Sequence, residues 1–266
     1  MKIKERTSYM NDIETLKIVF SVPQGIRLTP SIGSIMQGIL MEHIDTHYAA
    51  TLHTHALHPY SQYTRYYAKS RTLHWYISAL TNQACQEIIQ PLSTLPDEVY
   101  LKKKKLSLPI IRRSISYMST YERLAKKYIS PAQQLPHSPS IISYQFISPT
   151  ILKKQGLYLY YPEYSYLISS LLRKWNTFSH LDFLNTPEIS TLLINHPFRI
   201  EHYNLKMNFF SVERIKIPAF QGYLDVKLPQ NTMAQHILLL LSDYANCSGV
   251  GIKTAIGMGA MHTKEK

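Results

Sequence analysis

The sequence has few cysteines and no long hydrophobic run. Only two cysteines, Cys85 and Cys247, occur in 266 residues, and neither belongs to a CxxC pair, so neither a zinc knuckle nor a thioredoxin-like redox site is expected. The most apolar segment, HILLLLSDYA, is shorter than the roughly 20 residues that cross a bilayer, and the charged N-terminus lacks the apolar core of a signal peptide. These absences indicate a cytoplasmic protein with free thiols and no membrane-spanning segment.

Acidic residues are also scarce. The chain has 17 Asp and Glu against 29 Lys and Arg, a formal net charge of +12, and 45% of its residues are hydrophobic, which is enough for a folded core. A fold does not need this positive excess, but a polyanion attracts it, so RNA, DNA or an anionic membrane surface is the expected class of partner. Basic clusters that are expected to line part of an RNA track occur at 102–105, 112–113, 126–127, 153–154 and 173–174.

Hydrophobic periodicity and turn residues predict an order of strands and helices that occurs twice. The repeated order is typical of a ferredoxin-like βαββαβ unit, so we expect an α+β protein with two such domains in tandem, at 1–130 and 140–266. The segment SPAQQLPHSPS, with three prolines, is expected to separate them. The predicted strands are 14–22, 73–80, 98–114 (an extended pair), 140–148, 198–212, 214–228 and 258–262, and the predicted helices are 30–48, 81–92, 121–129, 163–178 and 231–246.

Four of the nine glycines fall in one short stretch, CSGVGIKTAIGMGAM (247–261). The stretch is not a nucleotide-binding P-loop, because Ile252 follows Gly251 where a lysine is required, and it is not a dinucleotide fingerprint, because only seven residues follow Gly259. A structural hairpin would explain one or two glycines. Glycines also allow a backbone to approach another polymer closely, and Lys253 adds charge, so the stretch predicts contact with a phosphate chain.

This stretch, with Ser248, Lys253 and Thr254 around the glycines, closely resembles the C-terminal glycine-rich loop of the CRISPR-associated endoribonucleases that process precursor RNA, members of the RAMP superfamily. The segments YQFISPTILKKQGLYLYYPE and IPAFQGYLDVKL resemble the same family in the same order. The resemblance implies tandem ferredoxin-like domains, CRISPR repeat RNA as partner, no cofactor and no metal. It also allows a homodimer or association with an interference complex. The residues that it implies bind RNA are Lys153, Lys154, Ser248, Gly249, Gly251, Lys253, Thr254, Gly257 and Gly259.

The family cuts one phosphodiester without metal: the 2′-hydroxyl attacks the adjacent phosphate, leaving a 2′,3′-cyclic phosphate and a 5′-hydroxyl. Histidine suits both proton transfers near neutral pH. Many members have a catalytic histidine in an LH step after the first helix, so the resemblance makes His53 the first candidate, with His55 and His58 behind it. The helix tyrosine of some relatives is replaced by Met41, and the candidate substitutes are Tyr60, Tyr63 and Arg65. Any of the 12 histidines could instead be a structural or exposed residue.

Two alternatives remain at this level. His43 and His47 are spaced like metal ligands on a helix, but HIDTH lacks the glutamate of the zinc-protease motif, and His43 continues an apolar stripe, which predicts a core or pocket-lining role. The protein could also be a catalytically inactive RAMP-type subunit that only binds RNA in an interference complex, or a general basic RNA-binding protein. The histidine cluster favours the enzyme.

Overall fold

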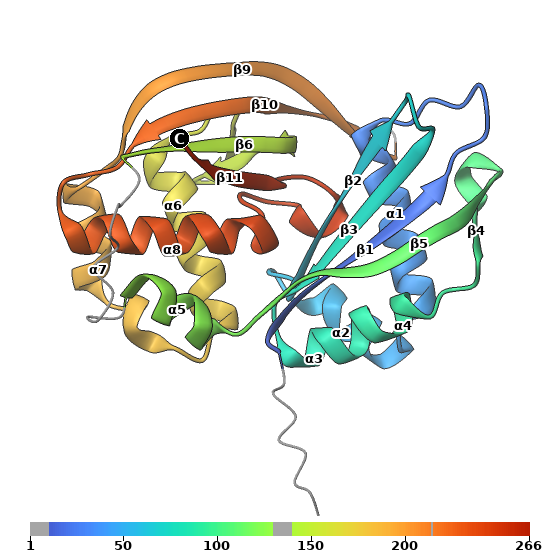
Figure 1. Ribbon diagram of the computed structural model, residues 1–266, viewed down its shortest axis with the longest axis horizontal. Helices are drawn as coiled ribbons and strands as arrows, with labels where there is room; N and C mark the ends of the chain where they lie inside the picture. The colour runs from blue at the N-terminus through green and yellow to red at the C-terminus, as the bar shows by residue number, and fades with distance from the viewer. Residues whose placement is uncertain (1–10, 130–139, 214) are drawn as a thin grey trace, which may run out of the picture.

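The computed structural model describes residues 11–129, 140–213 and 215–266, and it places two antiparallel sheets side by side, each with helices on one face (Figure 1). The proline-rich segment that was expected to separate two domains lies, except for residue 140, outside the described residues. Among the helices of the described residues, none combines the length and the apolarity that crossing a bilayer demands.

The first sheet has the strand order of a ferredoxin-like unit with one strand added. Its order is β2-β3-β1-β5-β4, so β1 lies between the second strand of a hairpin and the strand that follows the helices. The helices between these strands supply the buried residues that cover the sheet. The strands are β1 (Ile13–Ser21), β2 (Tyr60–Tyr67), β3 (Thr72–Ala79), β4 (Glu98–Leu101) and β5 (Leu106–Ser119), and the helices are η1 (Pro30–Ile32), α1 (Gly33–His43), α2 (Thr46–Thr54), α3 (Asn82–Ala84), η2 (Cys85–Ile89), α4 (Gln90–Ser93) and η3 (Lys102–Lys104).

The second sheet repeats this order as β11-β6-β10-β9. The tandem ferredoxin-like fold predicted from the sequence is therefore confirmed. A small separate hairpin, β7–β8, follows β6 directly. The strands are β6 (Ile141–Thr150), β7 (Leu152–Lys154), β8 (Leu157–Leu159), β9 (Arg199–Val212), β10 (Ile215–Lys227) and β11 (Met261–Glu265), and the helices are α6 (Tyr164–Phe178), η4 (Asp182–Leu184), α7 (Pro187–Asn195), α8 (Thr232–Ser248) and η5 (Thr254–Ile256).

The histidine-rich region differs from its prediction. The helix expected over 30–48 ends at His43, because Ile44 is extended and the carboxylate of Asp45 caps a new helix by accepting a hydrogen bond from the backbone N–H of Tyr48 at 2.9 Å. That helix, α2, continues to Thr54, through residues for which the sequence predicted neither a helix nor a strand. As a result, the loop before β2 is only five residues long, 55–59.

Strand β2 was missed because its sequence shows no alternation. Its first five residues are all buried, including the polar Ser61, Gln62 and Thr64, so both faces of the strand are covered. Polar residues on both faces do not produce the period of two that identifies a half-buried strand. The final strand also begins later than expected, at Met261, because the preceding residues belong to the glycine-rich stretch.

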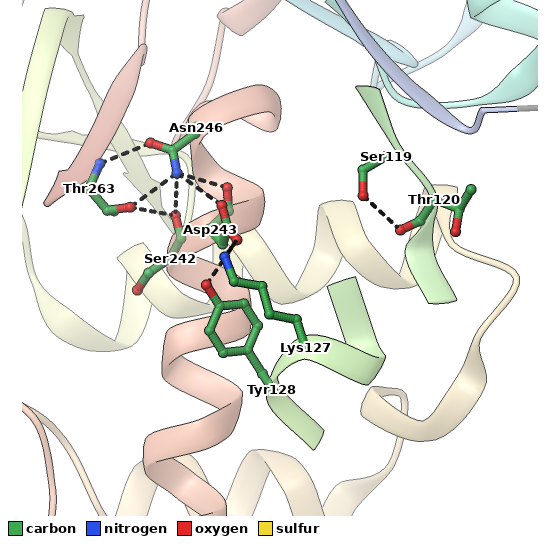
Figure 2. Close-up of polar contacts among 8 residues, drawn as sticks. All are labelled: Ser119, Thr120, Lys127, Tyr128, Ser242, Asp243, Asn246 and Thr263. Atoms are coloured by element: carbon green, nitrogen blue, oxygen red, sulfur yellow. Dashed lines mark hydrogen bonds and ion pairs between the residues drawn. The ribbon is translucent and has the colours of Figure 1, made fainter. Parts of the chain in front are cut away.

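Helix α5 (Tyr121–Ile129) packs with the second core, although the sequence interpretation placed it in the first domain. Its side chains of Tyr121, Leu124 and Tyr128 are buried in the cluster that contains α8. Figure 2 shows the polar rim of this contact: the carboxylate of Asp243 on α8 accepts hydrogen bonds from Lys127 Nζ at 2.8 Å and from the Tyr128 hydroxyl at 2.9 Å. The chain therefore passes from one sheet to the other before residue 130, and the two halves share an extensive interface.

Candidate functional site

The glycine-rich stretch connects α8 to β11 and folds back against its own chain. A Cβ atom on Gly251 would lie 2.2 Å from the carbonyl oxygen of Ile151, and one on Gly259 would lie 2.1 Å from that of Val250. Both glycines have positive φ, which L side chains rarely adopt. The close approach that these glycines permit is therefore internal to the protein. This corrects the interpretation that the glycines as a group face a nucleic acid: Ser248, Gly249, Gly251, Gly257 and Gly259 are all buried.

The turn of this stretch is its exposed part. Lys253 has a left-handed backbone (φ 61°) and an exposed side chain, and Thr254 is half-buried beside it. Together with the β7–β8 hairpin, α6 and the loop before β2, the turn encloses a cavity of about 350 Å³ that we call the basic pocket. None of the residues that line it is acidic. The lining residues that carry polar or charged side chains are His58, Lys153, Tyr158, Arg173, Lys174, Lys253 and Thr254.

The three candidate histidines are placed differently. His58 lines the basic pocket, whereas His55 lines a separate cavity with Thr51 and Phe178, and its Nδ1 is 2.8 Å from the carbonyl oxygen of Thr51. His53 is exposed on the last turn of α2 and does not line the basic pocket. The sequence interpretation preferred His53, but among the three histidines it is His58 that lines the basic pocket.

His58 is held in a half-buried position. Its Nδ1 is buried and has no hydrogen-bond partner among the described residues. Burial lowers the pKa of His58 below its usual 6.5, and the nearby His53 and His55 lower it further. The imidazole ring lies 5.7 Å, centroid to centroid, from the ring of Tyr60, which forms part of its support.

Tyr60 itself belongs to the first core. Its side chain is fully buried, its hydroxyl accepts a hydrogen bond from Gln37 Nε2 at 3.4 Å, and burial raises its pKa to about 12. A buried phenol with a raised pKa is a poor proton donor or acceptor for a bound RNA. Tyr60 is therefore less suited to proton transfer than the three histidines, because β2 begins with this side chain directed into the core.

The predicted basic residues converge only in part. Lys153 is exposed in the basic pocket, whereas Lys154 Nζ lies 3.6 Å from Glu163 and 5.0 Å from the ring centre of Tyr166. Lys102 pairs with a glutamate on α1. The cations of the basic pocket are thus Lys153, the cluster at 173–174 and Lys253.

Two residues hold the glycine-rich stretch in place, a role that the sequence interpretation gave to neither: Lys174 was named only as part of a basic cluster, and Gln62 was not named. Lys174, on α6, is 2% exposed, and its ammonium group donates hydrogen bonds to the stretch. Gln62, on β2, is 1% exposed, and its Nε2 donates to the carbonyl oxygens of Gly33 at 2.9 Å and Ala255 at 3.0 Å. A signal for Lys174 was present, because it lies seven residues after Leu167 on the apolar face of an amphipathic helix.

The possible metal ligands do not assemble. His43 is the last residue of α1, and the break at Ile44 separates it from His47, so the two histidines are not on one helix. Both side chains are exposed, which corrects the expectation that His43 lines the core. No group of three histidine, cysteine, aspartate or glutamate side chains within the described ranges could hold a metal ion.

The ferredoxin-like strand order recurs in both sheets, with β4 added to the first, so the chain is a tandem ferredoxin-like protein. Residues 144–261 match the family model of the CRISPR-associated endoribonuclease Cas6. Two curated relatives with this name are similar over 94% of the chain: that of Mycobacterium tuberculosis (strain ATCC 25618 / H37Rv) is 28% identical with 77% of its length covered, and that of Streptococcus thermophilus is 27% identical with 98% covered. The chain is therefore similar to the CRISPR-associated endoribonuclease Cas6 family, to its family model over residues 144–261 and to curated members over most of its length.

Solved structures agree on the fold. A Cas6 product complex aligns with a TM-score of 0.76 over 96% of this chain and 100% of that chain, at 20% identity. Thermus thermophilus Cas6 aligns with a TM-score of 0.72 at 18% identity, over 96% and 99% of the two chains. A RAMP protein described as binding different RNA substrates aligns with a TM-score of 0.58 at 11% identity, over 95% of this chain and all of that chain.

Proposed function

We propose that this protein is an endoribonuclease that cleaves CRISPR repeat RNA in precursor transcripts and thereby produces guide RNAs. The observation that carries the proposal is the basic pocket, where one histidine from the first half of the chain meets cationic side chains from the second half. Similarity to the Cas6 family supports the same activity, because the curated relatives are named as endoribonucleases. The RNA would lie across both halves, since neither half alone provides the histidine and the cations.

The chemistry that fits the pocket is attack of the ribose 2′-hydroxyl on the adjacent phosphate. The products are a 2′,3′-cyclic phosphate and a 5′-hydroxyl, and the reaction needs a proton acceptor, a proton donor and positive charge at the pentavalent phosphate. His58 has a lowered pKa, so its imidazole is neutral at pH 7 and can accept the 2′-hydroxyl proton. Lys153, Arg173 and Lys253 supply the charge, which makes a metal ion unnecessary for this step.

His58 is our first candidate for the general base, ahead of His53 and His55. The argument is geometric: His58 alone of the three lines the basic pocket, and its ring is held by burial and by contact with Tyr60. His53 and His55 are exposed on and just after the end of α2, where they are close enough to His58 to affect its charge. We propose that His53 and His55 affect the cleavage rate through the charge of His58 or through contacts with RNA that flanks the cleavage site.

The test is single-turnover cleavage of a repeat RNA from the array of direct repeats in the same genome. Cleavage should persist in excess EDTA and should stop when the scissile nucleotide carries a 2′-deoxyribose. His58→Ala should slow the reaction by roughly 10²- to 10⁴-fold, the usual effect of losing a general acid or base, while RNA binding is largely kept.

His53→Ala and His55→Ala are the matched controls, because each removes an imidazole from the same short segment. Full activity of His58→Ala together with a large loss in His53→Ala would return the role to His53. Tight binding of the repeat without a cut at any pH would instead favour a catalytically inactive RAMP-type RNA-binding subunit.

A further inference from the structure

Lys174 is a buried residue whose side chain bonds only oxygen atoms of the glycine-rich stretch among the described residues. Its Nζ donates hydrogen bonds to the carbonyl oxygens of Ser248 at 2.7 Å and Gly249 at 3.0 Å and to Thr254 Oγ1 at 3.2 Å. An ammonium group has three N–H donors, so all three are used within the glycine-rich stretch. No carboxylate of the described residues lies within ion-pair distance of this group, which is unusual for a lysine that is 2% exposed.

The three oxygens come from the two ends of the exposed turn. Ser248 is the last residue of α8 and Gly249 caps it, so their carbonyls are at the negative end of the helix, where a cation is favourable. Thr254 begins η5, immediately after Lys253. Lys174 therefore joins the start of the stretch to its turn. The conformation that exposes Lys253 in the basic pocket depends on this junction.

The charge of Lys174 is disfavoured in the free protein. Burial and, to a smaller degree, the charge of the neighbouring Arg173 lower its pKa to about 7. The other titratable or charged groups of the basic pocket are basic or neutral, so none of them offsets this effect. The negative charge of an RNA phosphate in the pocket would oppose this effect and favour the charged form of Lys174. The titratable or charged groups that line the basic pocket with Lys174 are His58, Lys153, Tyr158, Arg173 and Lys253.

We propose that Lys174 is a positioning residue whose ammonium group holds the glycine-rich stretch in the conformation that presents Lys253 and Thr254 to an RNA phosphate. The identity of the ligand rests on the proposed function, whereas the contact between Lys174 and the stretch does not. Loss of the proton leaves the amine with two donors, so at least one of the three oxygens is released and the turn loosens. Binding of RNA favours the ammonium form, so binding takes up a proton and weakens as the pH rises through about 7.

The first test uses the free protein. Amide hydrogen exchange is measured for residues 250–258 at pH 6 and pH 8.5 and corrected for the chemical exchange rate. In the wild type, protection should fall by about tenfold or more between the two pH values, the effect of losing one hydrogen bond to a charged group. Lys174→Met, which keeps an unbranched side chain without charge or donors, should show the low protection at both pH values, with α8 still protected.

The second test measures binding of a repeat RNA with 2′-deoxyribose at the scissile position. It uses the His58→Ala background, because this removes the other group of the basic pocket whose pKa is lowered. The affinity should fall about tenfold from pH 6 to 8.5, and Lys174→Met should abolish that pH dependence. Lys153→Met is the matched control: it removes one exposed positive charge from the same pocket and should lower the affinity equally at both pH values.

With His58 intact, Lys174→Met should raise the RNA concentration for half-maximal cleavage by about tenfold and change the saturating single-turnover rate by less than about threefold, since it acts on binding. Unchanged protection of 250–258 in Lys174→Met overturns the proposal whatever the RNA does. Changed protection with unchanged RNA affinity overturns the role in RNA binding. If the wild type cuts no repeat RNA, the proposed function fails, and the exchange experiment still decides whether Lys174 controls the stretch.

Discussion

Gln62 is predicted to be one of the most sensitive polar residues in the molecule, because its side chain joins three elements. Its Nε2 bonds the backbone of α1 and of η5, and its Oε1 accepts a hydrogen bond from the indole N–H of Trp75 at 2.5 Å. All these atoms are in the interior, where Gln62 is 1% exposed and Trp75 is fully buried. We consider the substitution Gln62→Met, which conserves length and volume but removes both the donor and the acceptor.

The magnitude follows from the groups that lose their partners. The Trp75 indole N–H and the Ala255 carbonyl would each remain buried without this hydrogen bond, at about 1–3 kcal/mol each, so the free energy of unfolding should fall by about 4 kcal/mol. In a protein of this size that loss lowers the melting temperature by roughly 10 °C. Because Gln62 ties the glycine-rich stretch to the first half, RNA cleavage should also weaken at temperatures where the variant is folded.

Thermal and urea unfolding followed by circular dichroism measure the effect. Gln86→Met is the matched control, since Gln86 is exposed and bonds only the side chain of Asn82, and it should change the free energy of unfolding by less than about 0.5 kcal/mol. A melting temperature of Gln62→Met within 2 °C or so of the wild type would refute the reasoning that this amide is needed by the buried groups around it.

The remaining predictions concern the glycine-rich stretch and the candidate base. Gly259→Ala should reduce the free energy of unfolding by more than about 3 kcal/mol, because a Cβ atom would lie 2.1 Å from the carbonyl oxygen of Val250 at a φ of +71°. Gly25→Ala is the control: at a φ of +83° in open space, it should reduce the free energy of unfolding by only about 1–2 kcal/mol. Equal melting temperatures of the two variants would contradict the steric argument. The cleavage rate should fall with decreasing pH only below 6.5, because protonated His58 accepts no proton, and the acidic limb should disappear in His58→Ala; an acidic limb that survives in that variant would assign the base elsewhere.

Much of the fold could be predicted because most elements carry a local signal. The helices α6 and α8 and the long strands β9 and β10 all appear where the sequence predicts them, within a residue or two at each end. Strand β2 carries no such signal, because Ser61, Gln62 and Thr64 are buried by contacts with both halves of the molecule. Burial of this kind depends on tertiary structure, and hydrophobic periodicity does not report it.

The candidate site shows the same division. The sequence identified the glycine-rich stretch, the basic clusters and the set of three histidines, but it ranked His53 first, because the family resemblance turns on an LH step. The ranking by position depends on where the loop 55–59 turns, and that turn places His58 rather than His53 beside Lys153 and Lys253. The glycines were correctly noted as unusual, yet their reason, close contact with Ile151 and Val250, involves a strand end and a backbone segment that no spacing rule connects.

By itself, the sequence predicted the α+β class, the repeated order of elements, a polyanionic partner and the resemblance to the Cas6 family, because each of these follows from composition, periodicity or a local motif. The tertiary structure alone decided which lysine faces the pocket and which is buried: Lys153 is exposed, while Lys174 holds the backbone of the glycine-rich stretch. The physical reason is that exposure and charge state depend on the neighbours that surround a side chain in space, and those neighbours come from segments as far apart as residues 58 and 253.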